Sequence, residues 1–66
     1  MIEYEVQFFN EKTGELEATT KVCYRALNYA EKVDEIVDLA WSAVKEDESL
    51  SSSDISDYRF NVFKKN

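Results

Sequence analysis

The spacing of apolar residues changes twice along this chain of 66 residues, and this change constrains the fold more than any other feature. Residues 2–9 and residues 16–24 alternate in character, with the period of two that is typical of half-buried strands. Gly14 lies between the two segments and supplies the positive φ that a short hairpin turn with a trailing bulge requires. We therefore predict an antiparallel hairpin with Glu5 opposite Lys21, an ion pair that helps to fix the register.

The middle of the chain has the period of a helix. Apolar residues recur there at three- and four-residue steps, at Ala30, Val33, Ile36, Val37, Ala40, Trp41 and Val44. This stripe predicts one amphipathic helix. Asn28 and Glu31 have the spacing of a capping box, so the helix is expected to begin at about Tyr29. The pattern ends near Glu46, and residues 49–54 have the composition of a solvated loop.

Alternation returns between residues 56 and 63 and predicts a third strand, with Tyr58, Phe60 and Val62 on one face. The segment 51–57 has a second interpretation. A serine cap followed by Asp54 is able to start a single helical turn before the strand. The sequence does not choose between the two.

The order strand, strand, helix, strand predicts an α+β fold of ββαβ type in a single domain, residues 1–66. With the first strand in the centre, the three-stranded antiparallel sheet has the order 2-1-3, and the helix packs on one face. The expected core consists of Tyr4, Val6, Phe8, Val22, Val33, Val37, Trp41, Tyr58, Phe60 and Val62.

The charge of the chain limits its partners. Fourteen acidic residues against eight basic residues give a formal charge of −6. This charge repels nucleic acid and anionic membranes, so we expect neither as a direct partner and expect a basic protein surface instead. No apolar run approaches the roughly 18 residues that span a bilayer, and the first residues lack the pattern of a secretion signal. A cytoplasmic location is therefore expected.

Side chains for catalysis are scarce. The chain has no histidine and one cysteine, Cys23, which excludes conventional nucleophilic triads. Its single glycine excludes phosphate-binding glycine loops and dinucleotide fingerprints. Residues 46–48 are acidic, but they lack the alternation and the inner glycine of an EF-hand. We therefore expect no enzymatic activity, no cofactor and no metal site.

Acidic side chains gather on two predicted surfaces. An acidic ridge follows the exposed side of the helix and consists of Glu31, Asp34, Glu35 and Asp38. A second patch is expected on the sheet face that the helix leaves open, at Glu3, Glu5, Glu15 and Glu17. One interpretation is that both are solvated surfaces that keep a small protein soluble. The other is that carboxylates about 6 Å apart along the helix resemble successive phosphates and fill the basic groove of a nucleic-acid-binding protein.

Aromatic residues are expected among the charges of the open sheet face. Phe9 and Phe63, with Ile55 as a third candidate, project from this face if the strand alternation holds, and exposed aromatics amid charge often mark a contact surface. A bulge would instead shift the alternation and bury one of them. The same face, or an outer strand, is also able to pair with a second copy. A small structural or assembly protein that forms a homodimer is therefore the alternative function.

In size, acidic charge and lack of catalytic groups, the chain resembles the very small acidic α/β proteins with which bacteriophages and mobile elements block host defence or DNA-processing machinery. The resemblance covers no motif and transfers no site residues. It implies a non-catalytic inhibitor that mimics the charge of nucleic acid and binds a basic nucleic-acid-binding protein. Partner contacts are expected at Glu31, Asp34, Glu35, Asp38, Glu3, Glu5, Phe9, Glu17 and Phe63.

Overall fold

The computed structural model describes the backbone of residues 2–25 and 29–65, and the side chains of these residues except 29–32. The predicted capping box falls outside this range, because neither Asn28 nor the side chain of Glu31 is described. Among the described helices, none combines the length and the apolar character needed to cross a membrane.

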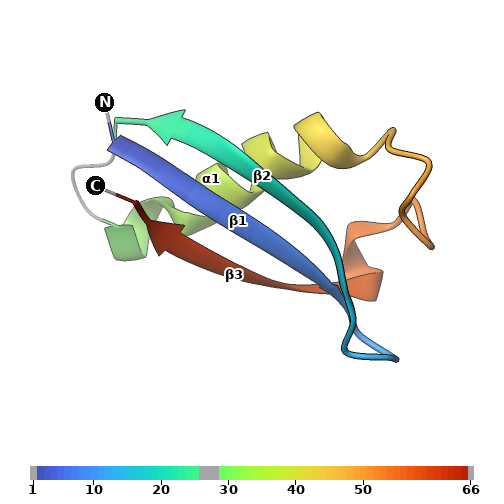
Figure 1. Ribbon diagram of the computed structural model, residues 1–66. Helices are drawn as coiled ribbons and strands as arrows, with labels where there is room; N and C mark the ends of the chain where they lie inside the picture. The colour runs from blue at the N-terminus through green and yellow to red at the C-terminus, as the bar shows by residue number, and fades with distance from the viewer. Residues whose placement is uncertain (1, 26–28, 66) are drawn as a thin grey trace.

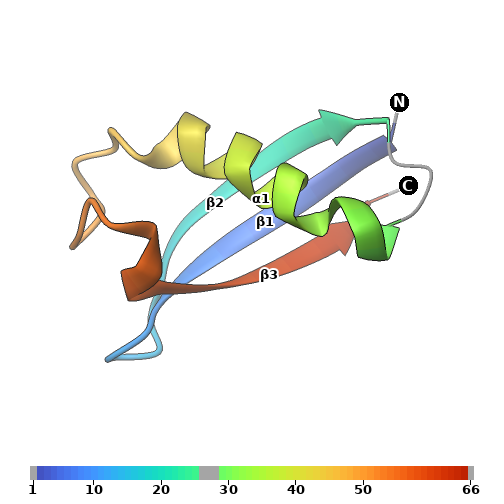
Figure 2. The ribbon, with the colours of Figure 1, turned by 180° about the vertical axis from the view of Figure 1, so that it is seen from behind.

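Three strands and one long helix make up the fold. Strands β1 (Ile2–Asn10) and β2 (Leu16–Tyr24) are followed by helix α1 (Tyr29–Val44), a short 3-10 helix η1 (Ile55–Asp57) and strand β3 (Tyr58–Lys64). The sheet is antiparallel with the order β2-β1-β3. Helix α1 covers one face and leaves the other open (Figures 1 and 2). The predicted ββαβ architecture is therefore confirmed.

The hairpin that joins β1 to β2 has the predicted register over most of its length. From Ile2 to Phe8 the pairs are as expected, with Glu5 opposite Lys21. Gly14 has a φ of 76°, and its N–H donates to the carbonyl oxygen of Asn10 at 2.8 Å. The only glycine of the chain is thus at the one position where the turn requires a left-handed backbone.

Beside the turn the register shifts by one residue. Phe8 lies opposite Ala18, but Phe9 lies opposite Leu16, so Glu17 is an additional residue on β2. A bulge of this kind reverses the side-chain directions on the part of the strand beyond it. Strict alternation from the core residue Val22 predicts Leu16 on the helix face, but it lies on the open face, 49% exposed. Glu17 was expected on the open face but turns to the loop after α1. Both placements were predicted wrongly, because a one-residue bulge leaves no mark in the alternation.

The third strand starts two residues later than predicted because η1 precedes it. The Asp54 carboxylate caps η1 by accepting a hydrogen bond from the N–H of Ser56 at 3.0 Å. The alternative of a single helical turn is therefore confirmed. Ile55, a candidate for the open face, is half-buried against the core, so that expectation is wrong.

The core lies between α1 and the sheet. Its buried residues are Tyr4, Val6, Phe8, Val22, Ile36, Val37, Ala40, Val44 and Tyr58. The Trp41 ring is half-buried and packs edge-on against Phe8, with centroids 5.5 Å apart, and beside Tyr58 at 5.6 Å. Val33 and Val62, which were expected in the core, are half-buried at its margin. Ile36, Ala40 and Val44 are buried stripe residues that the expected core omitted.

Phe60 is the one expected core residue that is exposed. It lies opposite Phe8 on the helix side of the sheet, yet 43% of its surface is accessible, whereas Phe8 is fully buried. Helix α1 crosses the sheet obliquely, from the C-terminal end of β3 to the outer side of β2 (Figure 2), and it contacts β2 more extensively than β3. Strand alternation specifies the face of a residue, but not how far the helix extends over it.

Candidate functional site

Helix α1 presents the acidic ridge to solvent. Asp34, Glu35 and Asp38 are exposed on the side of the helix opposite the buried stripe, while the side chain of Glu31 is not described. Within the described part of the chain, neither Asp34 nor Asp38 has an ion-pair partner. The structure therefore leaves these two carboxylates available to another molecule.

An exposed leucine borders the acidic ridge. Leu39 is 48% exposed and lies one helical turn after Glu35, next to Asp38. No role was predicted for Leu39 from the sequence, because Leu39 falls outside the apolar stripe. Its position among the acidic residues of the helix could have indicated a contact residue. Such a side chain adds apolar area that a docked partner removes from water.

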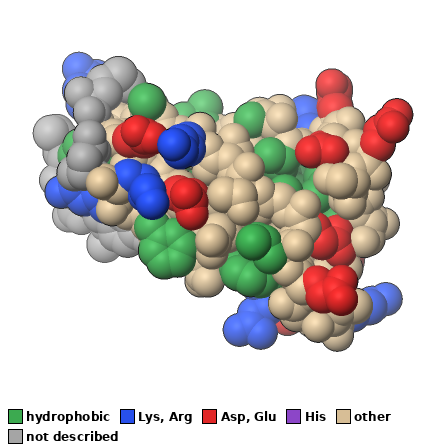
Figure 3. Space-filling model, viewed as in Figure 1, with side chains coloured by type: hydrophobic (Ala, Val, Ile, Leu, Met, Phe, Trp, Pro, Cys, Tyr) green, Lys and Arg blue, Asp and Glu red, His purple; other side chains and the backbone are tan. Residues whose placement is uncertain are grey.

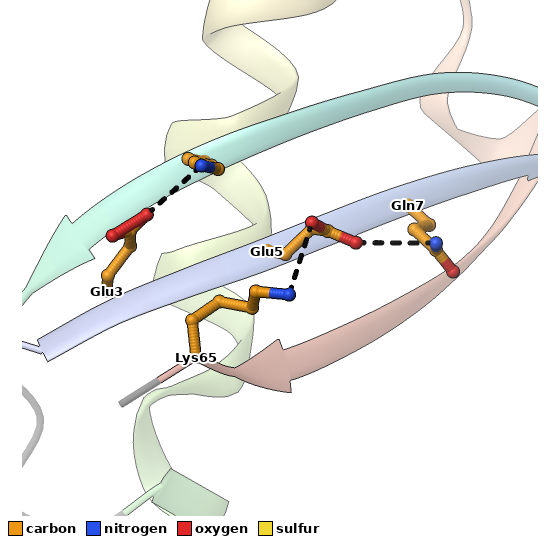
Figure 4. Close-up of polar contacts among 5 residues, drawn as sticks. Glu3, Glu5, Gln7 and Lys65 are labelled. Atoms are coloured by element: carbon orange, nitrogen blue, oxygen red, sulfur yellow. Dashed lines mark hydrogen bonds and ion pairs between the residues drawn. The ribbon is translucent and has the colours of Figure 1, made fainter.

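The open face of the sheet is not the acidic patch that was predicted. Lys21 Nζ lies 3.6 Å from the Glu3 carboxylate, and Lys65 Nζ lies 3.8 Å from the Glu5 carboxylate (Figure 4). Gln7 adds a hydrogen bond to Glu5 at 3.4 Å. Lys21 thus reaches diagonally to Glu3 and not to the opposite Glu5. Acidic and basic groups lie side by side on this face (Figure 3), and the carboxylates of Glu3 and Glu5 are each paired with a lysine.

The apolar residues of the open face lie at two separate positions. Phe63 is 45% exposed and lies opposite Glu5, whereas Phe9 is half-buried and lies between Leu16 and Arg59. Four strand positions separate residue 59 from residue 63, a distance of about 13 Å. Phe9 and Phe63 therefore do not form one continuous contact patch.

Glu17 holds the loop after α1 against the sheet. Its carboxylate accepts hydrogen bonds from the N–H (2.8 Å) and the hydroxyl (2.6 Å) of Ser51, from Nδ2 of Asn10 (2.9 Å) and from the phenol of Tyr58 (2.9 Å). We call these four residues the Glu17 network. The donors, with the Ser51 hydroxyl first, lower the pKa of Glu17 to about 2. The oxygens expected to contact a partner are thus already engaged within the chain.

Tyr58 joins the Glu17 network to the core. Burial is the main cause that raises the pKa of its phenol. The phenol oxygen accepts a hydrogen bond from the N–H of Ser52 at 3.0 Å, and the Ser52 hydroxyl donates to Asp57. The serine-rich loop, predicted to be solvated, is therefore tied to the sheet. No local pattern indicates this, because Glu17 and Ser51 are 34 residues apart in the sequence.

Carboxylates also concentrate where the β1–β2 turn meets the loop after α1, and Figure 3 shows them gathered over that end. The acidic residues of these segments are Glu11, Glu15, Glu46, Asp47, Glu48, Asp54 and Asp57. Two of these carboxylates accept hydrogen bonds from nearby backbone N–H groups. The N–H of Ser49 lowers the pKa of Asp47, and the N–H of Ser56 lowers the pKa of Asp54. Across the described residues, no group of three or more potential metal ligands is placed to hold an ion.

The arrangement offers three distinct surfaces: an exposed acidic ridge on α1, a charge-neutralised sheet face and an uncovered outer strand. No protein-family model matches the chain, and comparisons with curated proteins and with solved structures find no match either.

Proposed function

We propose that the protein is a non-catalytic binding module that docks the acidic ridge of α1 on a basic surface of another protein. The observation that supports this most directly is the exposure of Asp34 and Asp38, which lack an ion-pair partner among the described residues. Carboxylates one helical turn apart have a spacing similar to that of successive phosphates. The proposed partner is therefore a nucleic-acid-binding protein with a basic groove. A module bound in that groove excludes nucleic acid and so inhibits the partner.

The ridge is favoured over the other acidic candidates because two of its carboxylates, those of Asp34 and Asp38, have no ion-pair partner among the described residues. Glu3 and Glu5 are paired with lysines, and Glu17 accepts four hydrogen bonds. A partner that bound these groups would first have to break the existing contacts.

A pair of matched double variants tests this proposal. The probe is a fluorescein-labelled, arginine-rich peptide of twelve residues, and its affinity is measured by anisotropy at low and high salt. Asp34→Asn with Asp38→Asn removes two charges from the ridge, and we expect binding about fivefold weaker. The control, Glu11→Gln with Glu15→Gln, makes the same change of charge at two exposed residues of the hairpin turn. We expect the control to weaken binding clearly less.

Two results would overturn the proposal. If the affinity for the arginine-rich peptide is the same at low and high salt, binding is not electrostatic. If the control variant loses as much affinity as the ridge variant, the protein attracts cations through its overall charge and not through α1.

A second candidate function is self-association through the open sheet face. The half-exposed side chains of Leu16 and Phe63 favour it, since both lie on the face that α1 does not cover. Sedimentation at micromolar concentration separates this candidate from the first. A dimer that dissociates on Phe63→Ser supports it, and a strict monomer rules it out.

A further inference from the structure

The outer edge of β3 presents unpaired backbone groups at Phe60. The N–H of Glu11 donates to the carbonyl of Asp57, and the N–H of Lys65 donates to that of Glu3, both at 2.9 Å. In an antiparallel pair these bonded positions recur at every second residue, so Arg59 and the other odd-numbered residues face β1. Phe60 therefore directs its N–H and C=O outward, where no described residue bonds to them.

The side chains around this point form a shallow recognition surface. A hollow of about 260 Å³ is lined by Phe9, Gly14, Arg59, Phe60 and Asn61. Its lining includes two aromatic residues, an arginine and an asparagine. The exposed Phe60 ring lies on the helix side of the sheet, and the side chains of Arg59 and Asn61 lie on the open side.

The charge of β3 specifies what fits beside it. This strand carries Arg59 and Lys64 and no carboxylate, and neither cation has an ion-pair partner in the part of the chain that is described. A second copy that paired its own β3 here would bring four cations onto two adjacent strands, and like charges destabilise cross-strand pairs. A nucleic acid strand is disfavoured by the net charge of −6.

We propose that the edge of β3 at Phe60 pairs with an extended segment of another protein that carries a carboxylate next to an apolar residue. The backbone of this segment bonds to the N–H and C=O of Phe60 as an added strand. Its apolar side chain lies against the Phe60 ring, and the neighbouring carboxylate, on the opposite face of the new strand, reaches Arg59. This surface is separate from the acidic ridge and has the opposite charge, so the inference stands or fails independently of the proposed function.

A display selection tests the inference. Random linear peptides of twelve residues are selected on the full chain, and the enriched peptides are expected to contain an acidic residue adjacent to an apolar one. Arg59→Glu should weaken their binding about tenfold. Arg25→Glu, the same change at an exposed cation outside β3, should leave it nearly unchanged. A selected peptide whose acidic residue is replaced by lysine should bind the Arg59→Glu variant again. Such binding would show that this variant is folded. In the complex, hydrogen exchange of the Phe60 amide should slow.

Several outcomes would overturn the inference. Selection that yields no binders, or yields basic peptides, contradicts the stated chemistry of the partner. Equal loss with Arg25→Glu means that binding follows net charge. A single-stranded oligonucleotide that competes with the peptides, or a dimer that forms through β3, assigns the edge to a different occupant.

Discussion

The Glu17 network and the edge at Phe60 contain similar polar groups in opposite situations. At Glu17, a carboxylate, two hydroxyls, a backbone N–H and an amide satisfy one another and join β2 to the loop after α1. At Phe60, a guanidinium, an amide and two backbone groups have no such partners among the described residues. The comparison shows that the polar groups of one site are satisfied within the fold, whereas those of the other have no partner among the described residues.

The largest expected effect separates Phe8 from Phe60, which are neighbours across two strands and share the helix side of the sheet. Phe8 is fully buried, so Phe8→Ala should lower the free energy of unfolding by about 3–5 kcal/mol. Phe60 is 43% exposed, so Phe60→Ala should lower it by less than about 1 kcal/mol. Urea titration measures both. A similar loss for the two variants would mean that α1 covers β3 after all and that the edge is closed.

The second effect concerns the Glu17 network itself. Glu17→Ala leaves the N–H of Ser51 and the phenol of Tyr58 without their acceptor, so we expect the melting temperature to fall by several degrees. Glu15→Ala is the matched control, because Glu15 is an exposed carboxylate two residues away whose side chain bonds to no described residue. Thermal unfolding should show little change in the control. If the two variants melt together, the network contributes nothing to stability and the contrast with Phe60 disappears.

The parts of this fold that the sequence predicted are those that repeat. The two-residue alternation in β1 and β3 and the three- and four-residue stripe in α1 each contain several residues that report the same face, so one exception does not change the result. Gly14 was predictable for a different reason, since a single residue type fits the backbone of that turn.

The features that escaped prediction each depend on one residue or one distance. The bulge that turns Glu17 inward adds a single position to β2, and its partner Ser51 is distant in the sequence. The exposure of Phe60 depends on how α1 lies across the sheet, which the pattern of neither element records. The pairing of Glu3 and Glu5 with lysines depends on side-chain reach across strands. The candidate surfaces were therefore less predictable than the fold that positions them.

The smallest effect is a dependence of stability on pH to which the Glu17 network contributes and the edge at Phe60 does not. The pKa of Glu17 in the folded protein is about 2, below its ordinary value of 4.5, because the hydrogen bonds favour the charged form. Charged Glu17 therefore stabilises the folded state fully above about pH 4.5, and this contribution is lost as the pH falls toward 2.

Glu17→Gln removes this titration and keeps the shape of the side chain. Urea midpoints measured between pH 2 and 6 should fall more steeply for the unmodified protein than for Glu17→Gln, and the two curves should approach each other at the acidic end. Asp47 and Asp54, whose pKa values are also lowered, remain in both proteins and account for the slope that the variant retains. Parallel curves would show that the carboxylate of Glu17 is not held by its donors in solution. The Glu17 network and the edge at Phe60 would then differ in geometry, but neither would contribute to the free energy of unfolding through its polar groups.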